Sequence, residues 1–572
     1  LLDIVTPDPG HQKYQGARSR TKNQEQEDPF LPIVVTTRRE PEQSILIAAP
    51  VNSGRSTCCA RIIEDSLEMG HRIAVIVPIY DKFKRMAEEY KEKYNFVPLT
   101  GDPDADSLII MNEKAIIGTH SMFTTFDHFQ TVFIHDVHLI GNENFADYEA
   151  LISIMVSLEC ATRFIAVSAP ISNAKSLCLW LHIESQNSFV FSPQMRDISF
   201  QIQTFNFPTS KSRLMAMARP LYSAVKDSET SIIFVPSQSQ MYLTAFELIN
   251  FANINQKPQT FFRGESTDNL PIFENPVMND ISKFGVALYF PAMSARDKHT
   301  VLSNFGTTFG CIVTVIDSVW EINMSANVVA MKGTDIYDGT NHHHVDYPIE
   351  SIMEAMGYTM DGGRFVLFTH TPRKLYYMTF LTEPICVESN LDLYASDIFN
   401  LAVSLSLAMN KSQLVTFITK TFYYRRLIAN PSYYALPSRS PEYVADFVSE
   451  LVDNETDSLQ EIHAIEVINE NPLEPEQNEN PLVNESITEA EKTEDISLLT
   501  GGEVDDSRVS NEFAQKEMEQ EENQIEDGAI NILAIGQVAA EHAIDPNTSH
   551  MLAQLLTADC KHNKILRIIC NA

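Results

Sequence analysis

The sequence predicts an α/β protein with two tandem domains, each built on a parallel doubly wound sheet, followed by a mainly helical region. Three observations support this. Short runs rich in Val and Ile alternate with helical patterns from residue 44 to 204, and the same alternation returns from 205 to 386. The chain has 572 residues, which is too long for a single core.

The first segment, residues 1–43, is polar and irregular, and we expect a lead-in to the first domain. Residues 44–204 then carry five strand candidates and two amphipathic helices with charged faces. The expected strands lie at 44–50, 72–78, 115–120, 131–137 and 163–169, and the expected helices at 57–70 and 81–94.

The second domain, residues 205–386, repeats this pattern, and the chain then turns helical over 387–452. The expected strands of this domain lie at 231–237, 285–290, 311–317, 327–333 and 364–370, and its helices at 240–252 and 349–357. Helical spacing also marks 397–410 and 413–431, and it resumes after a long acidic segment at 530–544 and 547–556.

The acidic segment, residues 453–527, contains 24 Asp and Glu against 3 Lys and Arg, so it carries most of the net charge of −34. Its few aromatic residues and its Glu, Asn and Ser content predict disorder. The remainder is mildly acidic, which excludes a dedicated nucleic-acid binder with a basic surface. Charged residues such as Glu159 and Arg163 interrupt the longest apolar run, so no membrane partner is expected.

The eight cysteines form no CxxC pair, and several lie in apolar runs, which indicates buried thiols in a reducing compartment. The chain begins with Leu1, and we interpret it as a fragment of a longer protein. Cys58 and Cys59 open a helix, where packing is favoured over a redox role. His342, His343 and His344 have no matching Cys or Asp cluster in the sequence, so a solvated loop is favoured over a metal site.

The stretch "APVNSGRST", residues 49–57, joins a strand to a helix through a Gly/Ser turn, as in a phosphate-binding P-loop. Ser53 and Gly54 form the turn, and Ser56 keeps the hydroxyl that would meet Mg²⁺. Arg55 occupies the place of the P-loop lysine, and its planar guanidinium does not replace an ammonium point charge. The stretch is predicted to be the remains of a nucleotide site.

Several longer sequence motifs carry a resemblance to a known family: "VHLIG" at 137–141, "SNAKSLCLWL" at 172–181, "FVPSQSQMYLTA" at 234–245 and "YYRRLIANPSYY" at 423–434. With them the chain, from about residue 30 onward, resembles a DExH helicase cassette of superfamily 2. The resemblance is greatest to the degenerate C-terminal cassette of the large RNA helicase of the spliceosomal U5 particle. It implies two RecA-like domains (44–204 and 205–386), a winged helix (387–452), the acidic insert (453–527) and the start of a helical bundle (528–572).

The resemblance also implies which first-domain positions have lost their chemistry. Val34 stands where the family has the glutamine that binds adenine. In the Asp-Glu-x-His box, His135 replaces the Mg²⁺-binding Asp and Asp136 replaces the Glu that polarises water. Pro170 replaces the Thr of Ser-Ala-Thr. A nucleotide-binding remnant is therefore expected at Val34, Ser53, Gly54, Arg55 and Ser56.

In the second domain the family's arginine-finger box falls on residues 354–361. Ala355, Tyr358 and Asp361 stand at the three arginine positions, and Asp361 with Glu354 should repel phosphates. An RNA-contact remnant is implied at Thr100, Gly101, Thr119 and Asn323. The stretch "FYYRRLIANPSYY", 422–434, fits a winged-helix core with snorkelling arginines better than an RNA patch.

The expected function is that of a catalytically inactive cassette which needs neither ATP nor Mg²⁺ and acts in the nucleus. The resemblance implies that it regulates an active cassette N-terminal to it in the same chain, docks spliceosomal proteins and contacts RNA weakly. Two alternatives are open: an active ATP-dependent RNA helicase with divergent motifs, akin to the activating-signal helicase that shares "RRLIANPSYY", and a sensor that binds nucleotide without hydrolysis.

Overall fold

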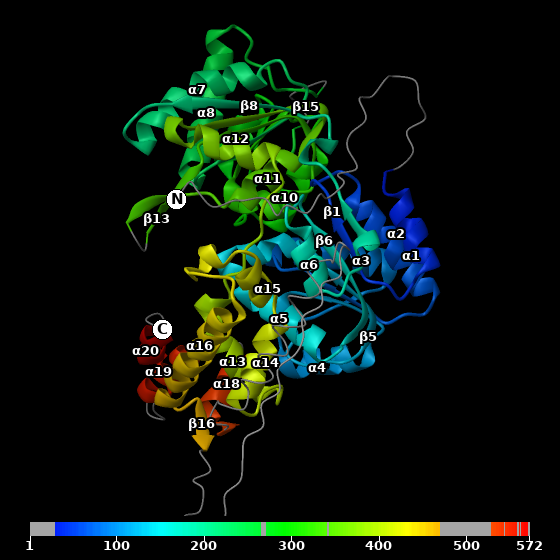
Figure 1. The fold of residues 1–572 in the computed structure, drawn as a ribbon. Coiled ribbons are helices and arrows are strands. Elements are labelled where there is room, and N and C mark those ends of the chain that lie inside the picture. The colour runs from blue at the N-terminus through cyan, green and yellow to red at the C-terminus, as the bar shows by residue number, and fades with distance from the viewer. Residues whose placement is uncertain are drawn as a thin grey trace, which may run out of the picture. The chain divides into compact units, whose positions relative to one another are not determined.

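The computed structural model describes residues 29–264, 270–339, 342–468, 528–542, 544–556, 560 and 562–569. These residues form two units, Leu1–Leu393 and Tyr394–Ala572. The first unit contains two separate parallel sheets, drawn from blue to green in Figure 1. We refer to the sheet ending at β7 and its helices as the first lobe, and to the sheet beginning at β8 and its helices as the second lobe. The prediction of two tandem parallel-sheet domains is confirmed.

The first lobe has seven strands in the order β3-β4-β2-β5-β6-β1-β7. Its inner strands are continuous Val and Ile runs buried on both faces, as parallel strands require. The strands are β1 (Ile45–Ala48), β2 (Ile73–Ile76), β3 (Val97–Pro98), β4 (Ala115–Gly118), β5 (Phe129–Ile134), β6 (Ala161–Ser168) and β7 (Ser188–Val190). The helices are α1 (Leu31–Arg39), α2 (Arg55–Glu68), α3 (Tyr80–Tyr94), α4 (Pro103–Asn112), α5 (Ala146–Ser157) and α6 (Ala174–Trp180).

The second lobe has six strands in the order β10-β11-β9-β12-β15-β8, and a separate antiparallel hairpin, β13–β14. The strands are β8 (Ser199–Phe205), β9 (Ser231–Val235), β10 (Val286–Tyr289), β11 (Cys311–Val315), β12 (Ala326–Lys332), β13 (Asp335–Asp338), β14 (His343–Asp346) and β15 (Thr359–His370). The helices are α7 (Ser210–Val225), α8 (Gln238–Ile254), α9 (Pro276–Ser282), α10 (Ala295–Ser303), α11 (Ile349–Gly357) and α12 (Lys374–Thr382).

The second unit is helical and carries one antiparallel strand pair, β16–β17. Its elements are α13 (Ala395–Ser404), α14 (Lys411–Thr419), α15 (Phe422–Ala429), α16 (Pro441–Glu461), β16 (Ile465–Ile468), β17 (Ala529–Ile532), α18 (Ala534–His542), α19 (Pro546–Leu555) and α20 (His562–Ile569). Within α15, Tyr423 and Tyr424 are buried, as expected for a winged-helix core.

Four predicted boundaries were wrong. Residues 31–39 of the lead-in form α1, and β8 joins the second sheet although residues 199–204 were assigned to the first domain. The acidic segment does not begin at 453, because α16 continues to Glu461 with its acids on the solvent side and Val452, Thr456 and Leu459 buried. A helix was expected from residue 530, but the structure has the strand β17 there, paired with β16, and the helix α18 begins only at Ala534.

Other expectations fall partly outside the described residues. Residues 469–527 of the acidic segment lie outside the described residues, so the disorder expected there stays a prediction. Residues 1–28 of the lead-in lie outside them as well. Five cysteines with described side chains are buried and form no disulfide: Cys58, Cys59, Cys160, Cys178 and Cys311. Among helices in the described ranges, none combines the length and apolarity needed to span a bilayer.

Candidate functional site

The turn between β1 and α2 has the predicted strand–loop–helix form. Gly54 has φ +106° and Asn52 φ +56°, so the turn depends on two residues that tolerate left-handed backbone. The Ser53 hydroxyl donates to the Pro50 carbonyl at 2.7 Å. The Phe30 ring lies over Gly54, where a Cβ would be 3.3 Å from the ring. The turn is therefore closed by its own side chains.

Arg55 begins α2 and is only 5% exposed. Its guanidinium donates to the Ala49 carbonyl at 3.3 Å and to the Asp136 carboxylate at 3.1 Å. Lys82 of α3 donates to the second oxygen of Asp136 at 2.5 Å. The cation that would face phosphate in a P-loop is thus directed toward an internal carboxylate.

Asp136 follows β5 with φ +51° and is buried between these two cations. Burial by itself opposes ionisation of the carboxyl, but Lys82 and Arg55 outweigh it and hold the pKa of Asp136 well below its usual range. Asp136 is therefore ionised, with one oxygen paired to each cation. We call Arg55, Asp136 and Lys82 the ion triad.

Two histidines flank Asp136 and are held neutral. Burial lowers the pKa of His135 to about 4 and that of His138 to about 3. His138 Nδ1 accepts a hydrogen bond from the Ala169 N–H at 3.2 Å, which couples the segment after β5 to the segment after β6. His135 Nε2 is buried and has no hydrogen-bond partner within the described part of the chain.

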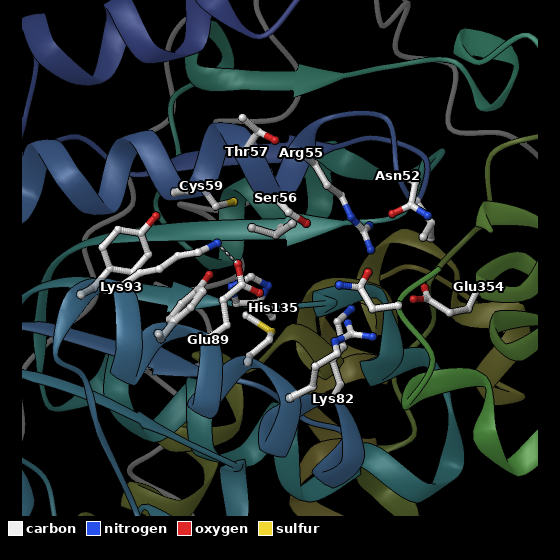
Figure 2. Close-up of a pocket in the computed structure, with 18 of the residues that line it drawn as sticks. Asn52, Arg55, Ser56, Thr57, Cys59, Lys82, Glu89, Lys93, His135 and Glu354 are labelled. Atoms are coloured by element: carbon white, nitrogen blue, oxygen red, sulfur yellow. Dashed lines mark hydrogen bonds and ion pairs between the residues drawn. The ribbon is translucent and has the colours of Figure 1, made fainter. Parts of the chain in front are cut away.

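A cavity of about 350 Å³ lies beside the triad and receives side chains from both lobes. Figure 2 shows Arg55, Lys82, His135 and Glu354 around it. Four cations line the cavity (Arg55, Lys82, Arg85 and Lys93), and all of them come from the first lobe. The second lobe contributes Asn323, Glu354 and Tyr358 to the lining, none of which is positively charged.

Of the three arginine-finger positions of the second lobe, Tyr358 lines the cavity, whereas Ala355 and Asp361 do not. Ala355 is fully buried in the core of this lobe. The Tyr358 hydroxyl donates to the Val319 carbonyl at 2.6 Å, and its ring stacks on Phe234. Asp361 pairs with Arg196 at 3.1 Å and does not line the cavity, so the expectation that it faces the phosphate site was wrong. Glu354 does line the cavity.

The adenine position also differs from a binding surface. Val34 lies in α1 and is 3% exposed, packed into the lobe together with Ile33. Phe30 packs on Phe191 with ring centroids 5.0 Å apart. An apolar, buried side chain at position 34 leaves no hydrogen-bonding group for a base edge.

The residues expected to contact RNA separate into two groups. The main-chain N–H groups of Thr100 and Gly101 and the Thr100 hydroxyl all donate to the buried Asp106 carboxylate. The Thr119 hydroxyl shares a hydrogen bond with Ser121. These residues follow the adjacent strands β3 and β4. Asn323 instead lines the cavity beside the P-loop-like turn, and the RNA contact expected of these four residues stays a prediction.

Three residues of the site were missed by the sequence analysis: Lys82, Arg85 and Arg196. Lys82 and Arg85 lie one turn apart on α3, where they read as ordinary charges of an amphipathic helix. The Arg85 guanidinium donates to the Ile322 carbonyl of the second lobe at 2.9 Å. Arg196 lies between the two sheets, in a stretch without any motif.

The active members of the family that the chain resembles use ATP and Mg²⁺, and the residues present here do not fit these groups. The side chain at the P-loop lysine position is already paired with Asp136. The metal and water positions of the family hold a neutral imidazole and a carboxylate engaged by two cations. In the described ranges no group of three or more His, Cys, Asp or Glu residues could hold a metal ion.

The histidine run lies in the β13–β14 hairpin, not in a loop as expected. His342 occupies its turn with φ +55°, and His343 and His344 are in β14. His344 pairs with Asp335 across the hairpin at 3.3 Å. The alternating register explains the hairpin, because it places Ile336 opposite Val345.

Comparisons with known proteins agree with this architecture. A winged helix-turn-helix domain model matches residues 388–469. The chain is 29% identical over 483 residues to the Arabidopsis thaliana DExH-box ATP-dependent RNA helicase DExH13, covering 77% of this chain and 22% of that protein. It is 28% identical over 488 residues to the human U5 small nuclear ribonucleoprotein 200 kDa helicase, covering 78% and 23%.

Another relative is the mouse activating signal cointegrator 1 complex subunit 3, which is 28% identical over 473 residues, covering 76% of this chain and 21% of that protein. The chain thus spans about a fifth of the length of the curated relatives it matches. Over about three quarters of its own length, the chain resembles the DExH RNA helicase of the spliceosomal U5 particle.

Proposed function

We propose that this chain is a catalytically inactive helicase cassette of a pre-mRNA splicing RNA helicase. The observation that carries the proposal is the ion triad. Asp136 pairs with both Arg55 and Lys82 inside the first lobe, at 3.1 and 2.5 Å, so the cation at the P-loop lysine position is already engaged by a group of the chain itself. For Arg55 or Lys82 to bind a triphosphate, its buried ion pair with Asp136 would have to break.

The second lobe supports the same proposal. A nucleotide in the cavity would meet Asn323, Glu354 and Tyr358 from that lobe, and therefore a carboxylate in place of a positive charge. An arginine finger contributes roughly 10³–10⁵ in rate to phosphoryl transfer. With neither the Mg²⁺-binding aspartate of the family nor such an arginine, the cassette lacks the groups that stabilise the transition state.

The role that follows is regulatory and structural. The relatives include a U5 small nuclear ribonucleoprotein helicase, and the chain matches less than a quarter of it. We infer that an active cassette belongs to the same protein, that this cassette modulates it, and that its surfaces dock spliceosomal proteins in the nucleus. RNA contact is weak in this proposal, since the N–H groups of Thr100 and Gly101 are engaged by Asp106.

Calorimetric titration with Mg²⁺-ATP tests the proposal. We expect no binding heat at millimolar nucleotide for the wild-type chain. Tight binding of Mg²⁺-ATP would refute the claim that the ion triad prevents nucleotide binding. Fluorescence anisotropy with single-stranded RNA at physiological salt should likewise give only weak binding, because phosphate contacts dominate such affinity and weaken steeply with salt. Submicromolar RNA affinity would contradict the scaffold role.

One observation favours a second candidate, a sensor that binds nucleotide without hydrolysing it. The cavity has about 350 Å³ and four cations in its lining, which suit an anionic ligand. Binding of ATP with equal affinity in the presence and absence of Mg²⁺, and without turnover, would support the sensor. The pairing of Arg55 and Lys82 with Asp136 makes it the weaker of the two proposals.

A further inference from the structure

Arg196 lies in the connection between the two lobes, after the short 3₁₀ helix Pro193–Met195 and before β8. Its side chain is 8% exposed and pairs with the Asp361 carboxylate at 3.1 Å. The same guanidinium donates to the Val51 carbonyl at 3.1 Å and to the Gly357 carbonyl at 2.7 Å. It also donates to the Thr359 carbonyl at 2.5 Å. The acceptors come from both lobes, so one side chain bridges them.

The tip of the P-loop-like turn makes two further contacts at the same place. The Asn52 side-chain amide donates to the Gly357 carbonyl at 3.0 Å. Val51 packs against the Cα of Gly357 so closely that a Cβ there would lie 2.4 Å from the Val51 Cβ. Gly357 is therefore needed for close approach of the two lobes. We call Arg196, Val51, Asn52, Gly357 and Asp361 the clasp.

A second bridge between the lobes starts from α3. Arg85 donates to the Ile322 carbonyl at 2.9 Å, and the Lys82 ammonium lies 5.7 Å from the centre of the Trp320 ring. Both bridges use groups of the chain itself. In two-lobed proteins that close around a ligand, the ligand normally supplies such bridging contacts.

We propose that Arg196 is a positioning residue which keeps the two lobes closed on each other in the absence of any ligand. The planar guanidinium suits this role because it donates in several fixed directions at once, which an ammonium cannot do. Three main-chain carbonyls and one carboxylate, from both lobes, then accept hydrogen bonds from this one guanidinium, so all four are held only when the lobes keep this relative position. The inference is independent of the proposed function, since closure by the clasp does not require that nucleotide be excluded.

The experiment measures the distance between the lobes directly. Nitroxide labels are attached to keto amino acids at Leu108 in α4 and Ile254 in α8, which are 64% and 66% exposed. Double electron–electron resonance on the full chain should give one narrow distance distribution. In Arg196→Ala the distribution should become roughly twofold broader, as expected for released lobes, and Arg196→Lys should be intermediate. An unchanged distribution in Arg196→Ala would overturn the proposal.

Arg72→Ala is the matched control. Arg72 has a similar set of contacts, to the Asp127 carboxylate at 2.7 Å and the Ile110 carbonyl at 2.7 Å, but all of them lie within the first lobe. Arg72→Ala should leave the distance distribution between the lobes as narrow as in the wild type. If Arg72→Ala broadens it as much as Arg196→Ala does, the broadening reflects a general loss of structure, and the role assigned to Arg196 is overturned. If Arg196→Ala does not fold, Asn52→Gly replaces it, because glycine tolerates the positive φ at this position and lacks only the side chain that donates to Gly357. Broadening then supports the clasp, and an unchanged distribution contradicts it.

Discussion

Replacing Asp136 by Asn removes the only negative charge of the ion triad while preserving the shape of the side chain. Arg55 and Lys82 then lie close together in the interior, 5% and 7% exposed, with no carboxylate between them. Leaving a buried charge without its partner is among the most destabilising effects of a single substitution. We therefore expect a large loss of stability in the first lobe.

The size of the loss follows from the two N–O distances. At 3.1 and 2.5 Å each attraction amounts to about 5–7 kcal/mol with an effective dielectric constant near 20. Desolvation of the three ions offsets several kcal/mol each. Removing one partner of such a buried group costs about 3–5 kcal/mol in the free energy of unfolding.

Urea unfolding followed by the fluorescence of Trp180, which is buried in the first lobe, measures this loss in a Trp320→Phe background. Added sulfate should recover part of it, because the two released cations then bind an anion that the wild type does not. Asp280→Asn is the control, since the Lys283–Asp280 pair is exposed and its loss should leave the midpoint unchanged. A loss below about 1 kcal/mol in Asp136→Asn would refute the ion triad as a buried, tightly paired group.

Three further predictions concern the same region. His135 and His138 have folded-state pKa values below the usual 6.5. The unfolded chain therefore binds more protons, and stability should fall by about 3 kcal/mol for the pair as pH drops from 6.5 to 5; urea midpoints across this range measure it. Tyr358→Phe leaves the Val319 carbonyl without its donor and should cost about 1–2 kcal/mol in urea unfolding. Arg55→Lys combined with Asn52→Gly should not restore phosphate release, because Asp136 still engages the cations and the groups that act together in catalysis are still missing.

Each of these has a control and a contradicting outcome. His138→Gln keeps an acceptor for the Ala169 N–H and should remove about half of the pH dependence. Equal pH dependence in wild type and His138→Gln would contradict the assignment. Tyr337→Phe, which alters a half-exposed hydroxyl, should leave stability unchanged. Phosphate release by the double variant alone would show that the metal and arginine positions matter less than argued.

The architecture of both lobes could be predicted because hydrophobic periodicity is a local signal. Runs such as Ile45–Ala48 and Ile73–Ile76 are buried on both faces, and this requires continuous apolar residues that the sequence displays. β8 escaped prediction because it is an exposed edge strand in which polar residues alternate with apolar ones. β16 and β17 pair across about 60 intervening residues, so neither strand signals its partner locally.

The sequence predicted which residues occupy the motif positions of the site, but not the contacts that those residues make. Comparison with the family's sequence motifs showed that Arg55, His135 and Asp136 replace its lysine, aspartate and glutamate. The turn before Arg55 has the expected strand–loop–helix form. What replaces the lost chemistry depends on contacts between distant residues: Asp136 with Lys82 over 54 positions, and Arg196 with Gly357 over 161. Contacts of this kind between distant residues have no periodicity, so only the folded structure reveals them.

Steady-state phosphate release from Mg²⁺-ATP, with and without single-stranded RNA, tests the central claim most directly. The ion triad and the missing second-lobe arginines predict no turnover above that of a heat-inactivated sample, and no stimulation by RNA. RNA-stimulated turnover by the unmodified chain would contradict the account, because it would require Arg55 to leave Asp136 and hold a phosphate.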